Sequence, residues 1–457
     1  MNISEAQTTR GEEPFPARSY AWYVATILTL AHIISFLDRQ ILSLLVTPIK
    51  RDLGINDTQM SLLMGLAFAI MYTFAAIPLG RLADRRSRRT IVIVGITAWC
   101  AMTAACGLAR NYAQLFLARI GVGIGEATLT PSALSMLSDY FPRERRGAAI
   151  GFYNMGVSVG AGIAFIVGGQ VIGFVMTSPP ITLPVIGELF AWQTVFLVVG
   201  LPGLVVAALM FSVREPRRRG KIITNPASTH DGAADVISLG DAAHFLMQRR
   251  KTYGGLAMVV AGTTILGYGF LNWIPSMFQR TWGLTMPEIA TNLGIVLLIA
   301  GPIGVNGGGW LTDHWLRQGH KDAPLRVMLI SAPIMLVASA ALPLMPTPEL
   351  ALLMFVPHIL GAAAITAAGG TALMLITPNQ LRAQATAIYY FIISLAGLTL
   401  GPTSVALLTD YVFRDEAALR YSMAIVGFAA PLLSVVSAVL MRRAYRRSVD
   451  EADGWQD

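Results

Sequence analysis

Long apolar stretches recur along the whole chain and constrain its fold more than any other feature. A membrane-spanning helix needs ~20 apolar residues, and twelve stretches of this kind follow one another, centred near Leu30, Phe68, Ala98, Ile124, Ala161, Leu204, Thr264, Leu298, Leu336, Ala363, Leu395 and Val435. Only 13% of the 457 residues are charged, about half the share in soluble proteins. None of the stretches shows the period-two alternation of an outer-membrane barrel. We therefore predict an all-α membrane protein with twelve transmembrane helices.

The basic residues are distributed unevenly around these spans. Of the 34 Lys and Arg, two lie within spans and 26 fall on the side of the membrane that holds both termini. The other six lie in loops on the opposite side, namely Lys50, Arg51, Arg110, Arg280, Arg414 and Arg420. Because cytoplasmic loops carry the excess of basic residues, we expect both termini in the cytoplasm and a bacterial inner-membrane location. The net charge of +8 then reflects topology, and we expect no nucleic-acid partner.

Two further features bear on processing and redox state. Cys100 and Cys106 both fall in the third span, and six residues on a helix turn them ~240° apart, so no disulfide is expected. Residues 1–19 form a polar tail without the features of a cleavable signal peptide. We expect the first span to act as the insertion signal.

Four ionisable residues lie inside the predicted spans, namely Asp38, Arg39, Arg119 and Glu126. Each charge at the centre of a bilayer costs ~2.5–3.5 kcal/mol on insertion scales, so four unpaired charges would cost roughly 10–14 kcal/mol. They are expected to face the inside of the bundle, where intramembrane charges mark the path of a substrate or ion. The sequence therefore indicates a transporter.

The spacing of these four residues limits how they can pair. Arg119 and Glu126 share one helix face but are ~10.5 Å apart along the axis, and the neighbours Asp38 and Arg39 do not face each other. We expect pairing between helices, either Asp38 with Arg119 or Arg39 with Glu126. Asp38 and Glu126 are candidate proton carriers, and Arg39 and Arg119 are candidates for binding an anionic headgroup. A static ion pair that orients two helices is the alternative.

A polar segment divides the spans six and six. The predicted parts are a tail (1–19), a first six-helix half (20–213), a cytoplasmic linker (214–252), a second six-helix half (253–444) and a second tail (445–457). Within the linker, Ser238–Met247 has helical apolar spacing, which predicts a short amphipathic helix on the membrane surface. A solvated linker with a basic end is the alternative.

The two halves also resemble each other in sequence. The run Gly80–Asp84 matches Gly309–Asp313, Pro142–Arg146 matches Pro378–Arg382, and at the latter offset Tyr153 corresponds to Tyr389. Such repeats place the substrate site between the halves, near the middle of the membrane.

Three sequence patterns resemble known families. Gly80-x-Leu82-x-Asp84-Arg85-x-x-Arg88-Arg89 is similar to the loop signature of the major facilitator superfamily, and both Phe36–Gln40 and Ala118–Ala127 resemble the Spinster-like lipid transporters. The organic anion–cation symporters of the same superfamily carry a similar Asp-Arg pair. This resemblance implies the two-half fold, alternating access, and a gating latch formed by Gly80, Asp84, Arg85, Arg88 and Arg89, with Asp313 at the equivalent place in the second half. The fifth span departs from the usual antiporter pattern, since Ala161 rather than Pro follows Gly160.

The second half has few polar groups within its spans. The candidates for lining a cavity there are Tyr268, Asn272, Trp273, His358, Tyr389 and Tyr390, with Tyr153 in the first half. For each second-half residue the alternative is packing between helices with no ligand contact. A cavity with one charged wall and one apolar wall suits an amphiphile, whose anionic headgroup would lie by the arginines.

Two short motifs typical of enzymes lack the structural context that enzymes need. Gly121, Gly123 and Gly125 are followed by no Lys-Ser/Thr, and Gly156–Gly160 matches a nucleophile elbow but lies within a predicted span. We therefore predict no enzymatic activity, no cofactor and no metal.

These observations converge on a monomeric, proton-coupled secondary transporter of a lysolipid or sphingoid phosphate. The alternatives are a proton-coupled symporter of a small organic anion and, more remotely, a membrane receptor or scaffold that does not transport.

Overall fold

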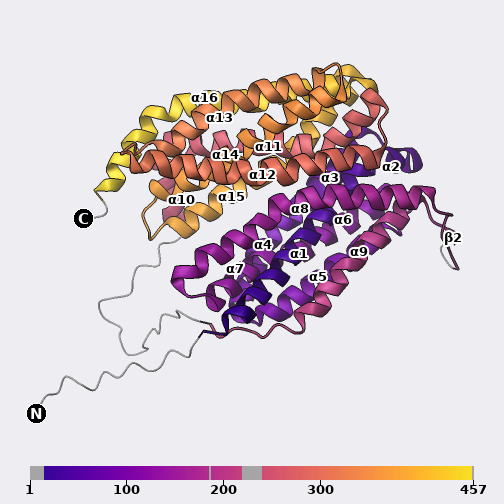
Figure 1. Ribbon diagram of the computed structural model, residues 1–457, viewed down its shortest axis with the longest axis horizontal. Coiled ribbons are helices and arrows are strands. Elements are labelled where there is room, and N and C mark those ends of the chain that lie inside the picture. Colours follow the sequence, from indigo (N-terminus) through magenta and orange to yellow (C-terminus); the bar gives the residue numbers. More distant parts are fainter. Residues whose placement is uncertain (1–14, 185–186, 219–238, 455–457) are drawn as a thin grey trace, which may run out of the picture.

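The computed structural model of the protein describes residues 15–184, 187–218 and 239–454, and these residues form an almost entirely helical bundle (Figure 1). The first half contains α1 (Arg18–Leu44), α2 (Val46–Leu53), α3 (Asp57–Met64), α4 (Leu66–Arg85), α5 (Arg88–Cys106), α6 (Tyr112–Glu126), α7 (Leu129–Tyr140), α8 (Arg143–Thr177) and α9 (Ala191–Met210). The short strands β1 (Thr182–Leu183) and β2 (Gly187–Glu188) pair antiparallel between α8 and α9, with Thr182 opposite Glu188.

The second half follows a connecting helix, α10 (Leu239–Gln248). It contains α11 (Arg250–Trp282), α12 (Met286–Arg317), α13 (Ala323–Ala341), η1 (Leu342–Leu344), α14 (Pro348–Leu375), α15 (Arg382–Leu407), the π-helical η2 (Leu408–Phe413), η3 (Glu416–Ala418) and α16 (Leu419–Asp453). The last helix continues to Asp453, past residue 444, where the apolar pattern ends.

Among the described residues, eleven helical segments are long and apolar enough to cross a membrane. The fourth predicted span is the exception, because it is divided into α6 and α7 at Ala127 and Thr128. Pro131 gives the physical reason: a proline has no backbone N–H and its ring clashes with the carbonyl four residues earlier, here that of Ala127. With α6 and α7 counted as one broken span, the arrangement is consistent with the predicted twelve.

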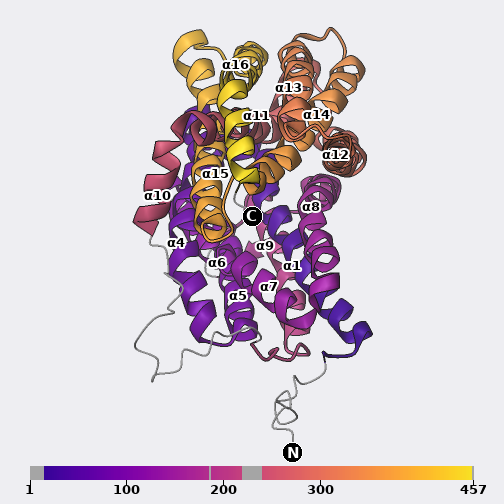
Figure 2. The ribbon, with the colours of Figure 1, turned by 90° about the vertical axis from the view of Figure 1, so that its left-hand side faces the viewer.

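The two halves lie side by side, as Figures 1 and 2 show from two directions. The start of α1 and the end of α16 lie at one end of the bundle, here called the terminal end; α2 and α3 lie at the opposite end. Glycines bring α8 and α12 into close contact towards the opposite end. A Cβ on Gly162 would come within 2.8 Å of the Gly294 carbonyl oxygen, and one on Gly169 within 2.5 Å of the Ala290 side chain.

The same two helices are not in contact towards the terminal end. A Cβ placed on Gly147 or Gly151 of α8, or on Gly307 or Gly309 of α12, would meet no atom within 4 Å. These two helices, one from each half, therefore meet towards the opposite end and diverge towards the terminal end (Figure 1).

The predicted linker helix is present as α10. It contacts α11 and α15, with Phe245 and Leu246 packed against the core and Met247 exposed. Ser238 lies outside the described residues. The position of α10 on a membrane surface stays a prediction.

Both cysteines are free and buried.

Candidate functional site

A buried ion pair joins the first and fourth spans. The Arg39 Nε–H of α1 donates to Glu126 Oε2 of α6 at 2.6 Å, and the Ser35 hydroxyl donates to the same oxygen at 2.6 Å. Glu126 is the last residue of α6, where the negative end of the helix dipole disfavours a carboxylate. The Arg39 guanidinium offsets that effect. This contact is one of the two cross-helix pairings expected from the sequence.

The other expected pairing is not formed. Arg119 donates through Nη1 to the backbone carbonyl of Asp38 at 3.2 Å, not to its carboxylate. Both carboxyl oxygens of Asp38 are buried and, among the described residues, have no hydrogen-bond partner. Sequence spacing indicates that Arg119 and Asp38 lie near each other. It does not indicate whether Arg119 meets the carboxylate or the backbone carbonyl of Asp38, so the prediction missed this geometry.

The two members of the Arg39–Glu126 pair differ in accessibility. The Arg39 side chain is 13% exposed, whereas that of Glu126 is 0% exposed. Among the described residues, Glu126 is the one hydrogen-bond acceptor of the guanidinium, so its terminal amino groups have no protein acceptor there. Paired N–H groups of this kind are the donors through which a guanidinium binds carboxylate or phosphate.

A cavity of about 230 Å³ lies between the two halves beside this pair. Phe36, three residues before Arg39, lines it together with α8 residues of the first half and α11, α12 and α14 residues of the second. No lining residue is charged, and the polar contribution is limited to hydroxyl groups, those of Ser158, Thr263, Thr264, Tyr268 and Thr366. The cavity wall is thus mainly apolar, and Phe36 connects it to Arg39, whose guanidinium carbon lies 5.2 Å from the Phe36 ring centroid.

The predicted lining residues occupy different environments. Tyr268 lines the cavity. Trp273 is buried and donates to the Pro402 carbonyl at 2.8 Å, and Asn272 donates to the Tyr268 carbonyl at 2.8 Å. His358 stacks against Phe270 and Phe355, with ring centroids at 5.0 and 5.6 Å.

The three remaining tyrosines lie on α8 and α15. Tyr153 stacks on His32 at 4.6 Å between ring centroids. Tyr389 is buried, with no partner for its hydroxyl among the described residues, while Tyr390 is half exposed. Apart from Tyr268, the lining role of the predicted residues stays a prediction.

The predicted latch residues lie at the terminal end. Asp84, Arg85 and Asp313 are exposed. A Cβ placed on Gly80 would lie 4.0 Å from the Cβ of Pro131. Arg88 is buried and contacts Asp139 and Glu215, and the Arg89 backbone N–H donates to Glu215 at 2.8 Å. These bonds stay within the first half and the segment that follows it, so the latch between halves stays a prediction.

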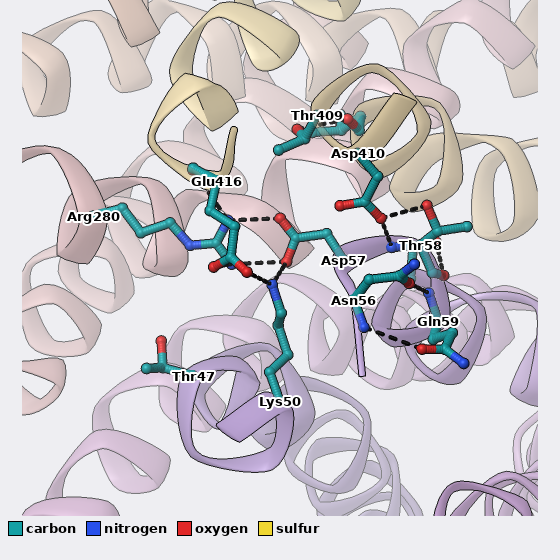
Figure 3. A network of polar contacts seen from close by, with 12 residues as sticks. Thr47, Lys50, Asn56, Asp57, Thr58, Gln59, Arg280, Thr409, Asp410 and Glu416 are labelled. Carbon is teal, nitrogen blue, oxygen red and sulfur yellow. Dashed lines mark hydrogen bonds and ion pairs between the residues drawn. The ribbon is translucent and has the colours of Figure 1, made fainter. Parts of the chain in front are cut away.

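At the opposite end, a polar network joins the halves (Figure 3). Asp57 of α3 accepts from Arg280 of α11 at 2.6 and 2.8 Å and also contacts Lys50. Lys50 in turn pairs with Glu416 of the second half at 2.8 Å. The group Lys50, Asp57, Arg280 and Glu416 is called the closing cluster below.

Two further contacts between halves flank this cluster. Asp410 of η2 accepts from the backbone N–H and the hydroxyl of Thr58, both at 2.6 Å. The Thr47 hydroxyl donates to Gln279 at 2.6 Å. Sequence reasoning missed these contacts between the halves, because their partners lie more than 200 residues apart and the basic members look like ordinary loop charges.

Two six-helix halves with a cavity between them define a helical membrane transporter. The chain belongs to the Major Facilitator Superfamily, whose family profile matches residues 28–356.

Several known proteins are similar to it. An MFS-type efflux pump of Mycolicibacterium smegmatis is 26% identical, over 94% of this chain and 95% of the pump. A probable L-galactonate transporter of Escherichia coli is 27% identical, over 66% of this chain and 63% of that protein. Among solved structures, a bacterial homologue of the human lysosomal transporter Spinster, inward-facing and unoccupied, is 25% identical with a TM-score of 0.76, over 95% of this chain and 99% of that one.

Proposed function

We propose that this transporter moves an amphiphilic, lipid-like anion, such as a lysolipid or a sphingoid phosphate, by alternating access. The observation that carries the proposal is the position of Arg39: its partly accessible side chain lies against Phe36, and Phe36 lines a cavity whose lining residues are all uncharged. The headgroup would bind the free amino groups of Arg39, and the chain would lie against the second half. Arg119, fully buried on its carbonyl partner, would support α1 from behind.

The apolar residues that line the cavity support an amphiphilic substrate. Leu271, Leu297 and Ile359 lie on its second-half wall with Ala362 and Ala363, and apolar surface of this kind gains free energy by covering a hydrocarbon chain, about 25 cal/mol per Å². The chain is also similar over nearly its whole length to a bacterial homologue of the lysosomal transporter Spinster, and the sequence resemblance to the Spinster-like group is what suggested a lipid-like substrate.

The orientation follows from the basic residues. Cytoplasmic loops are enriched in Lys and Arg, so the terminal end would be cytoplasmic. The separation of the halves at that end would then make this the inward-facing state. The similar Spinster homologue is also inward-facing.

Coupling to protons is part of the proposal. Glu126 competes with the substrate anion for Arg39, and Asp38 is buried without a partner among the described residues. Binding a proton removes the charge of a carboxylate and, with it, the cost of burying that charge. Proton exchange at Glu126 would therefore release Arg39 for substrate, and Asp38 would exchange a proton when the halves move.

A second candidate is proton-coupled symport of a small organic anion such as a sugar acid. The similarity to a probable L-galactonate transporter favours it, and the same Arg39 would bind the carboxylate. Five hydroxyl groups in the cavity would bind the hydroxyls of the sugar.

Ligand-dependent thermal stability separates these candidates. We expect lysophosphatidate or sphingosine 1-phosphate to raise the melting temperature of the purified protein, because a ligand that binds the folded state stabilises it by mass action. Galactonate and galacturonate test the second candidate in the same assay.

The Arg39→Met variant combined with Glu126→Gln removes both charges together and avoids leaving Glu126 unpaired. This double variant should lose the shift, while Arg51→Ala, an exposed site at the opposite end, should keep it. A shift with the sugar acids and none with the lipids would replace the first candidate with the second.

A further inference from the structure

Three aromatic rings surround the Arg39 guanidinium. Its central carbon lies 4.6 Å from the ring centroid of Phe68, 4.7 Å from that of Tyr72 and 5.2 Å from that of Phe36. All three distances fall within the ~6 Å at which a cation is attracted to the face of a ring. Phe36 comes from α1 itself, whereas Phe68 and Tyr72 come from α4, the second span.

Phe68 and Tyr72 act as one surface. They are four residues apart on α4, and their rings are stacked with centroids 5.0 Å apart and planes inclined by 22°. The guanidinium carbon and the two ring centroids therefore form a nearly equilateral triangle. The guanidinium is therefore within cation–π distance of both rings of the pair.

Phe68 also contacts the second arginine. The guanidinium carbon of Arg119 lies 5.7 Å from the same ring centroid. Phe68 is thus shared by two cations that carry like charges in an apolar setting, and it contributes the negative face of its ring to both. Because Phe68 is 1% exposed, it reaches no ligand itself.

A glycine on α6 allows this arrangement. A Cβ at Gly123 would lie 2.6 Å from the Phe68 carbonyl oxygen and 3.3 Å from the Tyr72 backbone nitrogen. No residue with a side chain fits there unless α4 moves away from α6. Gly123 therefore lets α4 approach closely enough to bring both rings onto Arg39, which gives this member of the glycine run a specific structural role.

We propose that Phe68, with Tyr72, is a positioning residue for the anion site. The rings fix the plane of the Arg39 guanidinium, so that Glu126 takes the Nε–H and the terminal amino groups are presented edge-on to an oxyanion with two parallel oxygens. This inference rests on the proposed function, because it assigns Phe68 a role in recognition of the proposed anionic headgroup.

Comparing variants with and without a ring tests the inference. The probe is lysophosphatidate, with uncharged monoacylglycerol as the control ligand, titrated into the purified protein in nanodiscs. Phe68→Leu keeps apolar volume but removes the ring, and we expect it to weaken lysophosphatidate binding about 10-fold while leaving monoacylglycerol binding unchanged. Phe165→Leu, an equally buried phenylalanine, is the matched control and should bind both ligands as the parent does.

Tyr72 provides a second pair of variants in case Phe68→Leu does not fold. Tyr72→Phe retains the ring and should match the parent, whereas Tyr72→Leu should show the selective loss. Two results would overturn the positioning role. One is equally weakened binding of lysophosphatidate and monoacylglycerol, and the other is unchanged lysophosphatidate binding in both leucine variants.

The failure of the proposed function has a different signature. If the parent binds galacturonate but not lysophosphatidate, the lipid proposal fails, and the same variants measured with galacturonate decide the role of the rings. If the parent binds neither anion, both inferences fail.

Discussion

At the residue scale, the account depends on a charge pair whose two members differ in accessibility. The sequence alone predicts that Asp38, Arg39, Arg119 and Glu126 face the inside of the bundle, because lipid exposure of four charges is too costly. The sequence also predicts the Arg39–Glu126 contact as one of two possible pairings between helices. It does not predict the rings around Arg39, because their position depends on the close approach of α4 and α6 at Gly123.

Replacing Glu126 by glutamine tests the competition at this pair. Glutamine keeps a hydrogen-bond acceptor for Arg39 but has no charge, and bonds to a charged partner are about twice as strong as neutral ones. Glu126→Gln should therefore bind lysophosphatidate about tenfold more tightly at pH 7, and its binding should depend less on pH than that of the parent, with only the titration of the ligand phosphate remaining. Isothermal titration across pH 5–8 measures both effects, with Glu349→Gln as an exposed control. Weaker binding in Glu126→Gln would show that Glu126 holds the substrate rather than competing with it.

Glu215, outside the membrane spans, gives a prediction about pH and stability. Burial raises the pKa of its carboxyl, but hydrogen bonds from the Arg89 backbone and from Arg88 and Ser87 outweigh burial, and the pKa is lowered overall. A lowered pKa in the folded state adds stability above the unfolded-state pKa, ~4.3, and this stability is lost as the pH falls through the folded value.

Glu215→Gln should consequently lower the melting temperature by about 2 °C at pH 7, a modest effect because the site is partly exposed. The gap to the parent should close as the pH is lowered below ~4. Glu188→Gln, an exposed site on β2, should leave the melting curve unchanged. A gap that stays constant with pH would contradict the assignment.

At the element scale, helix positions follow from the sequence more reliably than breaks within them. Apolar length alone predicts the spans, and eleven of the twelve correspond to helical segments long enough to cross a membrane. The break between α6 and α7 escapes this reasoning because the apolar pattern continues through it. Pro131 is the local signal that could have revealed it.

The α8–α12 contact offers a matched pair of glycine variants. An alanine at Gly162 would place its Cβ 2.5 Å from the Leu298 side chain and 2.8 Å from the Gly294 carbonyl oxygen, whereas one at Gly151 meets nothing within 4 Å. Gly162→Ala should cost about 1–3 kcal/mol through overpacking. Gly151→Ala should be neutral or slightly stabilising, since glycine is the poorer helix former by ~1 kcal/mol. Thermal unfolding in detergent compares them, and equal melting temperatures would exclude a tight α8–α12 contact.

At the scale of the whole molecule, the closing cluster shows how the halves can separate without leaving buried charges unpaired. Lys50 and Asp57 both belong to the first half, and Arg280 and Glu416 both belong to the second. When the halves part, each half keeps one cation and one anion. This avoids the 3–5 kcal/mol that removal of one partner from a buried pair costs.

Removing Arg280 should favour opening at this end. Arg280→Ala deletes the bidentate contact with Asp57 and should raise the population open at the opposite end more than tenfold. Electron–electron distances between spin labels at Arg51 and Glu349, with Cys100 and Cys106 replaced by alanine, report the separation. Arg420→Ala is the matched control, because its bonds to Pro343 and Met345 stay within the second half. Identical distance distributions in both variants would mean that the closing cluster does not hold the halves together.

The most direct test of the account is transport of lysophosphatidate across sealed proteoliposomes, scored by extracting the lipid from the outer leaflet with albumin. We predict protein-dependent flux that responds to an imposed pH gradient and is abolished in the Arg39→Met, Glu126→Gln double variant. Flux that is absent in the parent, or undiminished in the double variant, would contradict transport of an anionic amphiphile through the Arg39 site.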